Sequence, residues 1–123
     1  MKMKKILIVD DEPHIVMSLE FAFKKKNYEV FIARDGTEAI EILESQVPHV
    51  ILLDIMMPQM DGYETLKRIK NITELAKTKV IFLSAKNKSL DIEKGLNLGA
   101  DKYIIKPFSI KQVINEIEEM IKV

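Results

Sequence analysis

The sequence contains no cysteine, and only two histidines occur among its 123 residues. The absence of cysteine excludes disulfides, thiolate catalysis and zinc sites with cysteine ligands. Long apolar runs are also absent, because none approaches the roughly 18 residues of a membrane-spanning helix. The apolar run after the basic residues 1–5 ends at Asp10, which is too short for the apolar region of a signal peptide. We therefore expect a cytoplasmic protein without a membrane segment.

The sequence also lacks a net charge, because nineteen basic residues balance nineteen acidic ones. A nucleic-acid-binding surface requires a basic surplus, so direct binding of nucleic acid is not expected. Hydrophobic residues make up 47% and charged residues 31% of the chain, which is typical of a globular protein rather than a disordered one. The length suits one domain, which we expect to span residues 1–123.

Short apolar segments rich in β-branched residues alternate with segments of helical period. Segments that are apolar on both faces are typical of strands in a buried parallel sheet. Strict alternation of strand and helix implies right-handed crossovers and helices on both faces of the sheet. The sequence thus predicts an α/β fold, a doubly wound five-stranded parallel sheet with five helices. The expected strands are 6–9, 30–33, 50–53, 80–83 and 103–105.

Local signals mark where the expected helices begin and end. Pro13 suits the first turn of the first helix, where a missing N–H costs little. Gly99 follows the fourth helix and could end it with a positive φ. Three further starts resemble a capping box, in which an N-cap side chain is followed three residues later by Glu or Gln. These pairs are Asp35 with Glu38, Asp61 with Glu64, and Ser109 with Gln112.

Three carboxylates lie at the carboxyl ends of predicted strands. Asp10 and Asp11 end the first strand, and Asp54 ends the third. In the strand order 2-1-3-4-5, one of the two common orders of doubly wound sheets, these strands are neighbours at the point where ligands bind. Converging carboxylates repel one another, and a hard divalent cation such as Mg²⁺ is the simplest compensation.

Two further polar groups follow the remaining strands. Ser84 ends the fourth strand and Lys106 follows the fifth, where both could contact a phosphoryl group on Asp54. A carboxylate nucleophile, a metal and a cationic side chain are the parts that phosphoryl transfer needs. Taken singly, each residue also has an ordinary reading: Asp10, Asp11 and Glu12 as caps of the first helix, Asp54 and Ser84 as turn residues, and Lys106 as a solvated loop lysine.

Several motifs together resemble the receiver domain of response regulators. They are Ile-Leu-Ile-Val-Asp-Asp-Glu at 6–12, Leu-Asp-Ile-Met-Met-Pro-Gln-Met-Asp-Gly at 53–62, Ser84-Ala85, Gly-Ala-Asp-Lys-Tyr at 99–103, and Lys106-Pro107-Phe108. The resemblance covers essentially the whole chain and implies the flavodoxin-like receiver fold with strand order 2-1-3-4-5.

The resemblance also implies roles for the carboxylates. Asp54 would accept a phosphoryl group from the phosphohistidine of a sensor histidine kinase or a phosphotransfer protein. Asp11, Asp54 and the backbone carbonyl of Met56 would ligate Mg²⁺ directly, and Asp10 would act through a metal-bound water. Lys106 would pair with the phosphoryl group.

Further roles concern the switch that follows phosphorylation. Ser84 would donate a hydrogen bond to the phosphoryl group, and the small Ala85 would leave room for the donor. Tyr103 would rotate inward and re-pack the face made by the fourth helix, fifth strand and fifth helix. That face would meet a downstream protein, a fused output domain or a second copy of the chain. The Lys106–Pro107 peptide bond would be cis.

The protein would thus be a signalling switch that promotes its own phosphoryl transfer, not an enzyme acting on a separate substrate. Met56 and Lys86, two residues beyond Asp54 and Ser84, offer no carboxylate or amide to orient water, which predicts slow self-dephosphorylation. His14 and His49 lie on different elements and are expected at the surface.

Three other functions are alternatives to a receiver domain. An FMN-binding protein of the same architecture needs a phosphate loop after the first strand, where the acidic residues 10–12 would repel phosphate. An aspartate-nucleophile phosphatase places a second aspartate where this chain has Met56. A pseudo-receiver that acts only as an interaction scaffold stays open as the alternative function.

Overall fold

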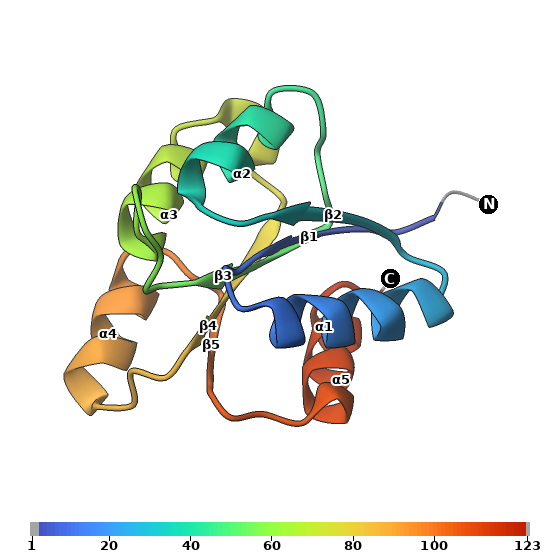
Figure 1. Cartoon of the computed structure of the whole chain (residues 1–123). Coiled ribbons are helices and arrows are strands. Elements are labelled where there is room, and N and C mark those ends of the chain that lie inside the picture. The colour runs from blue at the N-terminus through green and yellow to red at the C-terminus, as the bar shows by residue number, and fades with distance from the viewer. Residues whose placement is uncertain (1–2, 123) are drawn as a thin grey trace.

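The computed structural model of the chain describes residues 3–122, which form one five-stranded parallel sheet with the order β2-β1-β3-β4-β5 (Figure 1). The predicted fold class and strand order are confirmed, and every predicted strand lies within one residue of its observed bounds. The strands are β1 Lys5–Val9, β2 Glu29–Ala33, β3 Val50–Asp54, β4 Lys79–Ser84 and β5 Lys102–Ile105.

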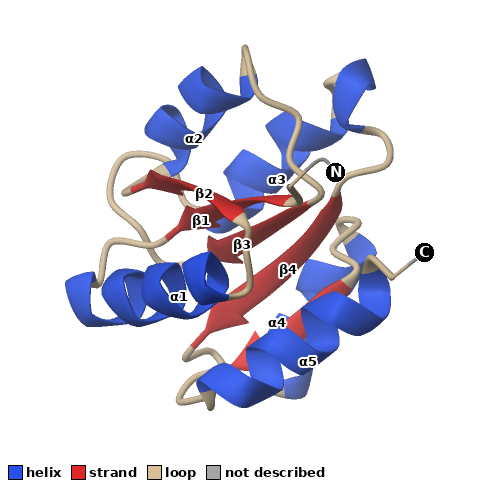
Figure 2. Cartoon of the chain, turned by 90° about the vertical axis from the view of Figure 1, so that its right-hand side faces the viewer, coloured by secondary structure: helices blue, strands red, loops and turns tan. Residues whose placement is uncertain are grey.

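Helices cover both faces of this sheet, as predicted. Figures 1 and 2 show α1 and α5 on one face and α2, α3 and α4 on the other. The helices are α1 Pro13–Lys25, α2 Gly36–Leu43, α3 Gly62–Lys70, α4 Ser89–Asn97 and α5 Ile110–Met120. A short 3₁₀ helix, Thr73–Leu75, was not expected from the sequence. Within the described residues, no helix has the length and apolarity to cross a membrane.

The three inner strands are buried on both faces, which explains their continuous apolar sequences. Alternate side chains point to opposite sides of a strand, so each strand serves two separate clusters of packed residues. The cluster under α2, α3 and α4 includes Leu7, Val9, Ile51, Leu53, Val80 and Phe82. The cluster under α1 and α5 includes Ile6, Ile8, Val50, Leu52, Ile81 and Leu83.

The predicted N-cap side chains all make their hydrogen bonds. Asp35, Asp61 and Ser109 each accept a hydrogen bond from the backbone N–H three residues later, at 2.9, 2.9 and 3.0 Å. The return bond of a complete capping box does not appear among the described hydrogen bonds. Glu38, for example, accepts from the backbone N–H of Arg34, one residue before the N-cap. The capping pattern therefore predicts the helix starts but not the second half of the motif.

Candidate functional site

The carboxyl ends of β1, β3 and β5 bring acidic groups and a lysine to one rim of the sheet. Asp10 follows β1 and Asp54 is the last residue of β3. Both carboxylates are almost fully buried, with relative exposures of 1% and 4%. Glu12, on the loop between β1 and α1, joins them, and the three residues offer oxygens that all lie within 4.8 Å of one another. Strand order thus gathers groups that are more than forty residues apart in sequence.

Lys106 lies among these three carboxylates. Its Nζ is 2.9 Å from Asp10 Oδ2, 2.9 Å from Glu12 Oε1 and 3.5 Å from Asp54 Oδ2. The lysine follows β5 directly, its backbone N–H donates to the Ser84 carbonyl at 2.8 Å, and its peptide bond to Pro107 is cis, as the family resemblance implies. Its side chain is only 9% exposed. The end of β5 therefore holds a nearly buried cation beside Asp54.

Burial changes the protonation behaviour of the site. Burial, and next the charge of Asp10, raises the pKa of Asp54 to about 6, although Lys106 and the backbone N–H of Met56 oppose the rise. Burial likewise raises the pKa of Asp10. Burial alone would lower the pKa of Lys106, but its hydrogen bonds to Asp10 and Glu12 outweigh that effect and the pKa is raised. One lysine thus only partly compensates the negative charge of the rim.

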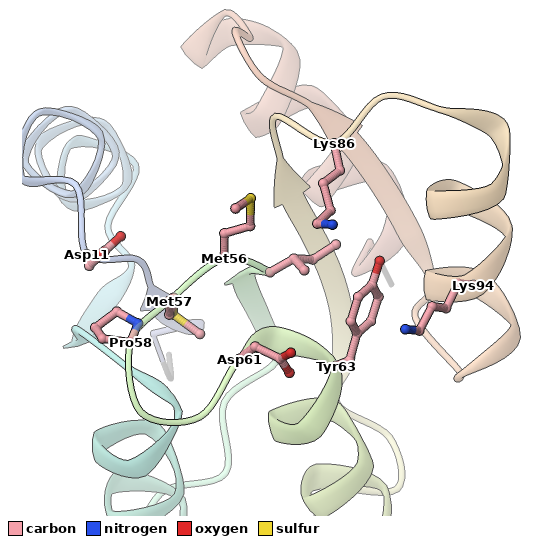
Figure 3. A pocket seen from close by; sticks show the side chains of 9 residues that line it. Asp11, Met56, Met57, Pro58, Asp61, Tyr63, Lys86 and Lys94 are labelled. Carbon is pink, nitrogen blue, oxygen red and sulfur yellow. The ribbon is translucent and has the colours of Figure 1, made fainter.

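The donor set fits a hard divalent cation. The acidic cluster offers carboxylate oxygens, which suit Mg²⁺. Burial, and next the charge of Asp10, raises the pKa of Asp54, and a bound cation would favour its ionised form. Asp10, Glu12 and Asp54 would hold such an ion. Asp11, expected from the resemblance to be a direct ligand, is exposed and lines the neighbouring cavity instead of joining the cluster (Figure 3). Met56, whose carbonyl is the other ligand that the resemblance implies, lies on the loop directly after β3 and lines the same cavity as Asp11.

Glu12 is the member of the cluster that the sequence reasoning did not single out as a site residue. It occupies the N-cap position of α1, where a capping role was the ordinary reading. Its side chain makes no capping hydrogen bond and binds Lys106 instead. Its backbone N–H donates to Asp10 Oδ1 at 2.9 Å, which orders the loop. Its place directly after two aspartates at a strand end was the signal available in the sequence.

Ser84 and Tyr103 hold the same residue of the β4–α4 loop. Ser84 is fully buried at the end of β4, and its Oγ accepts a hydrogen bond from the Lys86 backbone N–H at 3.1 Å. The Tyr103 hydroxyl donates to the Lys86 carbonyl at 2.8 Å. The Tyr103 ring packs edge-on against Phe82, with centroids 6.1 Å apart. The two predicted switch residues are therefore linked through the backbone N–H and C=O of one residue, Lys86.

The two histidines lie at opposite ends of the sheet and are exposed, as predicted. His14 lines a groove beside Lys106 and Phe108. His49 precedes β3, and its Nδ1 accepts a hydrogen bond from the backbone N–H of Lys5. Neither histidine lies in the acidic cluster.

Comparison with known proteins agrees with this arrangement. The family model described as the response regulator receiver domain matches residues 6–118. The receiver domain of the Francisella response regulator 1452 is 33% identical, with 97% of each chain covered and a TM-score of 0.89. A CheY-like receiver domain protein of Methanospirillum hungatei is 31% identical, with 98% of this chain and 94% of that chain covered and a TM-score of 0.91. The Vibrio cholerae chemotaxis protein CheY4 is 27% identical over 97% of this chain and 99% of that one, again with a TM-score of 0.91. With two buried aspartates and a lysine at the rim of a 2-1-3-4-5 sheet, this chain belongs to the response regulator receiver domain family of two-component systems.

Proposed function

We propose that Asp54 is the phosphoacceptor of this receiver domain and that its phosphorylation switches an output surface. The observation that carries the proposal is the buried Asp54 carboxylate, 3.5 Å from the Lys106 ammonium and clustered with Asp10 and Glu12. A nucleophile, a cation and metal-binding carboxylates thus share one rim. The chain acts as a signalling switch rather than as an enzyme with a separate substrate, and a cytoplasmic location is part of the proposal.

The transfer takes its phosphoryl group from the phosphohistidine of a sensor kinase or a phosphotransfer protein. A carboxylate oxygen of Asp54 attacks phosphorus, the P–N bond breaks, and the nitrogen keeps the electron pair, so that a protonated ring leaves as neutral imidazole. Ala85 is exposed and lines a groove with Lys106 and Pro107, which gives a donor access to the rim. Bound Mg²⁺ would supply electrostatic neutralisation of the phosphoryl oxygens.

The residues around Asp54 stabilise the product by charge and hydrogen bonding. Lys106 moves its ammonium from the Asp54 carboxylate to the new phosphoryl oxygens, a short displacement because the two groups are already in contact. Ser84 donates its hydroxyl to the same group from the neighbouring strand end. Preorganised donors in a buried site cost little reorganisation when charge is added.

The switch connects this rim to the face formed by α4, β5 and α5. Tyr103, held through Lys86 to Ser84, packs beside α4 and responds to any movement of Ser84. Leu90 and Ile105 on that face are 77% and 39% exposed, which suits a surface that binds another protein. Phosphorylation shifts the population between two packings of this face. The partner is a downstream protein, a fused output domain or a second copy of the chain.

Reaction with acetyl phosphate and Mg²⁺ tests the proposal. Intact-mass spectrometry should detect one phosphoryl adduct on the wild-type chain, and none on the Asp54→Asn variant or when EDTA removes the metal. Asp35→Asn is a matched control, because Asp35 caps α2 and lies outside the acidic cluster, so that variant should be phosphorylated normally. A folded wild-type protein that forms no adduct would favour the interaction scaffold.

A further inference from the structure

The cavity that Asp11 lines, of about 590 Å³, opens on the α3–α4 side of the phosphoacceptor rim (Figure 3). Ile55, Met56 and Met57, on the loop after β3, give it an apolar side. Lys86 of the β4–α4 loop and Lys94 of α4 line it from the other side. This volume lies within the range of small-ligand pockets, so the cavity can accept one or two side chains of a partner protein.

The two lysines of this cavity are without carboxylate partners. Within residues 3–122, neither ammonium lies within 4.0 Å of a carboxylate oxygen. In Figure 3 the side chains of Lys86 and Lys94 both extend toward Tyr63. Lys94 Nζ is 4.2 Å from the centroid of the Tyr63 ring, a cation–π contact. Two cations therefore converge on one aromatic side chain.

Tyr63 adds a third unused donor. Its side chain is 9% exposed, and its hydroxyl is buried without a hydrogen-bond partner in the described structure. Buried polar groups are almost always paired, so a buried hydroxyl without a partner needs an explanation. The two ammonium groups can only donate and the phenol can also donate, so an oxyanion would accept from all three together.

The acidic residues near the cavity limit which anion fits. Asp11 and Asp61 also line it, and Asp61 Oδ1 is already bonded to the backbone N–H of Glu64. These carboxylates repel a polyanion such as a nucleic acid, while a single carboxylate on the lysine side remains favourable. Because the other side of the cavity is apolar, the residue next to that acidic residue in the partner should be apolar.

We propose that this cavity binds an acidic side chain of a partner protein, with Lys86, Lys94 and Tyr63 as donors and an adjacent apolar side chain covering Met56 and Met57. The partner is thus recognised by an apolar residue beside a glutamate or aspartate. Charge complementarity and the unpartnered Tyr63 hydroxyl commit the site to this occupant.

The site is coupled to the switch through the backbone of Lys86, a point that rests on the proposed function. The Ser84 hydroxyl has one hydrogen and two lone pairs, so it can donate to a phosphoryl group while it still accepts from the Lys86 N–H. Phosphorylation of Asp54 therefore fixes Ser84 in place, and with it the Lys86 backbone that Ser84 and Tyr103 already position by hydrogen bonds. Binding at the cavity and occupancy of Asp54 then favour each other, as linkage requires.

A pair of capped dipeptides tests the site without relying on phosphorylation. Acetyl-Leu-Glu-amide is titrated in EDTA against ¹⁵N-labelled protein, with acetyl-Leu-Gln-amide as the uncharged control. The acidic peptide should give saturable NMR shifts at the amides of Lys86, Lys94 and Tyr63, and the control should bind at least about threefold more weakly. Lys94→Met should raise the Kd of the acidic peptide by about threefold or more, whereas Lys88→Met, at an exposed lysine outside the cavity, should leave it nearly unchanged.

A second titration, with Mg²⁺ and beryllofluoride, tests the coupling. The mimic should tighten peptide binding at least about twofold in the wild type and not in Asp54→Asn. Equal binding of both dipeptides, or shifts confined to the surroundings of Lys106, would overturn the inference even if beryllofluoride loads. An unchanged Kd in the loaded protein would refute the coupling, whereas peptide binding without beryllofluoride loading would refute the proposed function alone.

Discussion

At the scale of single residues, the buried carboxylate of Asp54 is costly to the metal-free protein. Its pKa of about 6 lies above the value of about 4 expected in the unfolded chain, so the folded state binds the proton more tightly. Stability therefore falls as pH rises from about 4 through 6 and stays low above that range. Without metal, Asp54→Asn should raise the free energy of unfolding near pH 7 by up to about 3 kcal/mol.

Urea unfolding in EDTA across this pH range measures the effect. The advantage of the Asn variant should shrink toward zero as pH approaches about 4, where the wild-type carboxyl is protonated in both states. Adding Mg²⁺ near pH 7 should stabilise the wild type more than the variant. A wild-type protein as stable as the variant at neutral pH would show that the carboxylate is already compensated.

Two tyrosine hydroxyls in contrasting environments make a matched pair. The Tyr63 hydroxyl is buried without a partner, whereas the Tyr103 hydroxyl donates to the Lys86 carbonyl. Removing an unsatisfied group relieves a desolvation cost, and removing a satisfied one leaves a carbonyl unpaired. Tyr63→Phe should raise stability by about 1 kcal/mol and Tyr103→Phe should lower it by about the same amount, as measured by chemical denaturation. The reverse order would contradict this assignment of hydrogen bonds.

Met56 bears on the lifetime of the phosphorylated state. Its side chain is 62% exposed beside Asp54 and offers neither carboxylate nor amide to orient an attacking water. Met56→Asn should raise the rate of phosphate release from the phosphorylated protein severalfold, because an amide there can position the attacking water, although it lacks the roughly hundredfold effect of a general base. Met17→Asn, at an equally exposed methionine on α1, is the control. A release rate that Met56→Asn leaves unchanged would count against slow hydrolysis being set at this position.

The sequence located Asp10, Asp54 and Lys106 because each follows a strand, and parallel strands end at one rim. It could not show which of the neighbours Asp11 and Glu12 would join the acidic cluster. Which of these neighbours turns inward depends on Lys106, which is 94 residues from Glu12 in sequence. A side-chain direction set by so distant a partner leaves no local pattern.

At the scale of elements, α1 and α4 end in the same way but with different residues. After each helix, the next residue but one adopts a positive φ: Asn27 at 67° and Gly99 at 112°. In each case two backbone N–H groups cap the last turn, with Tyr28 donating to the Phe23 carbonyl and Ala100 to the Gly95 carbonyl. These are Schellman motifs, and the Phe23 and Tyr28 rings, 5.0 Å apart, supply the accompanying apolar contact.

Glycine adopts this left-handed conformation without steric cost, and asparagine does so less readily. Asn27→Gly should therefore raise the thermal midpoint, by a gain of about 0.5–1 kcal/mol, and Gly99→Asn should lower it by a similar amount. Calorimetry of both variants measures whether the thermal midpoint rises or falls in each. If Asn27→Gly destabilises the protein, the unfolded-state entropy of glycine outweighs the relief of strain.

Element boundaries were predictable where a local cause fixed them. The inner strands were found because both of their faces are buried, and the helix starts were found because Asp35, Asp61 and Ser109 cap them. The 3₁₀ helix Thr73–Leu75 was missed because its three residues carry no period and no side-chain cap. Its position depends on packing, since Leu75 belongs to the cluster under α2, α3 and α4.

At the scale of the whole molecule, the order of the strands concentrates acidic residues at one rim, although the chain as a whole has no net charge. β1 and β3 are adjacent although α1, β2 and α2 separate them along the chain. Alternation of strand and helix predicted this layout, and the family motifs fixed the strand order. The rim in turn connects through Ser84 and Lys86 to Tyr103 of β5, which lies against Gly95 of α4.

The central claim is that this rim transfers a phosphoryl group to one carboxylate. Phosphoramidate carries the same P–N bond as phosphohistidine, and its reaction with the protein in Mg²⁺, followed by peptide mapping, tests the claim most directly. The account predicts a single acid-anhydride phosphoryl group on Asp54. A phosphoryl group on another residue, or none on the folded protein in saturating metal, would contradict it.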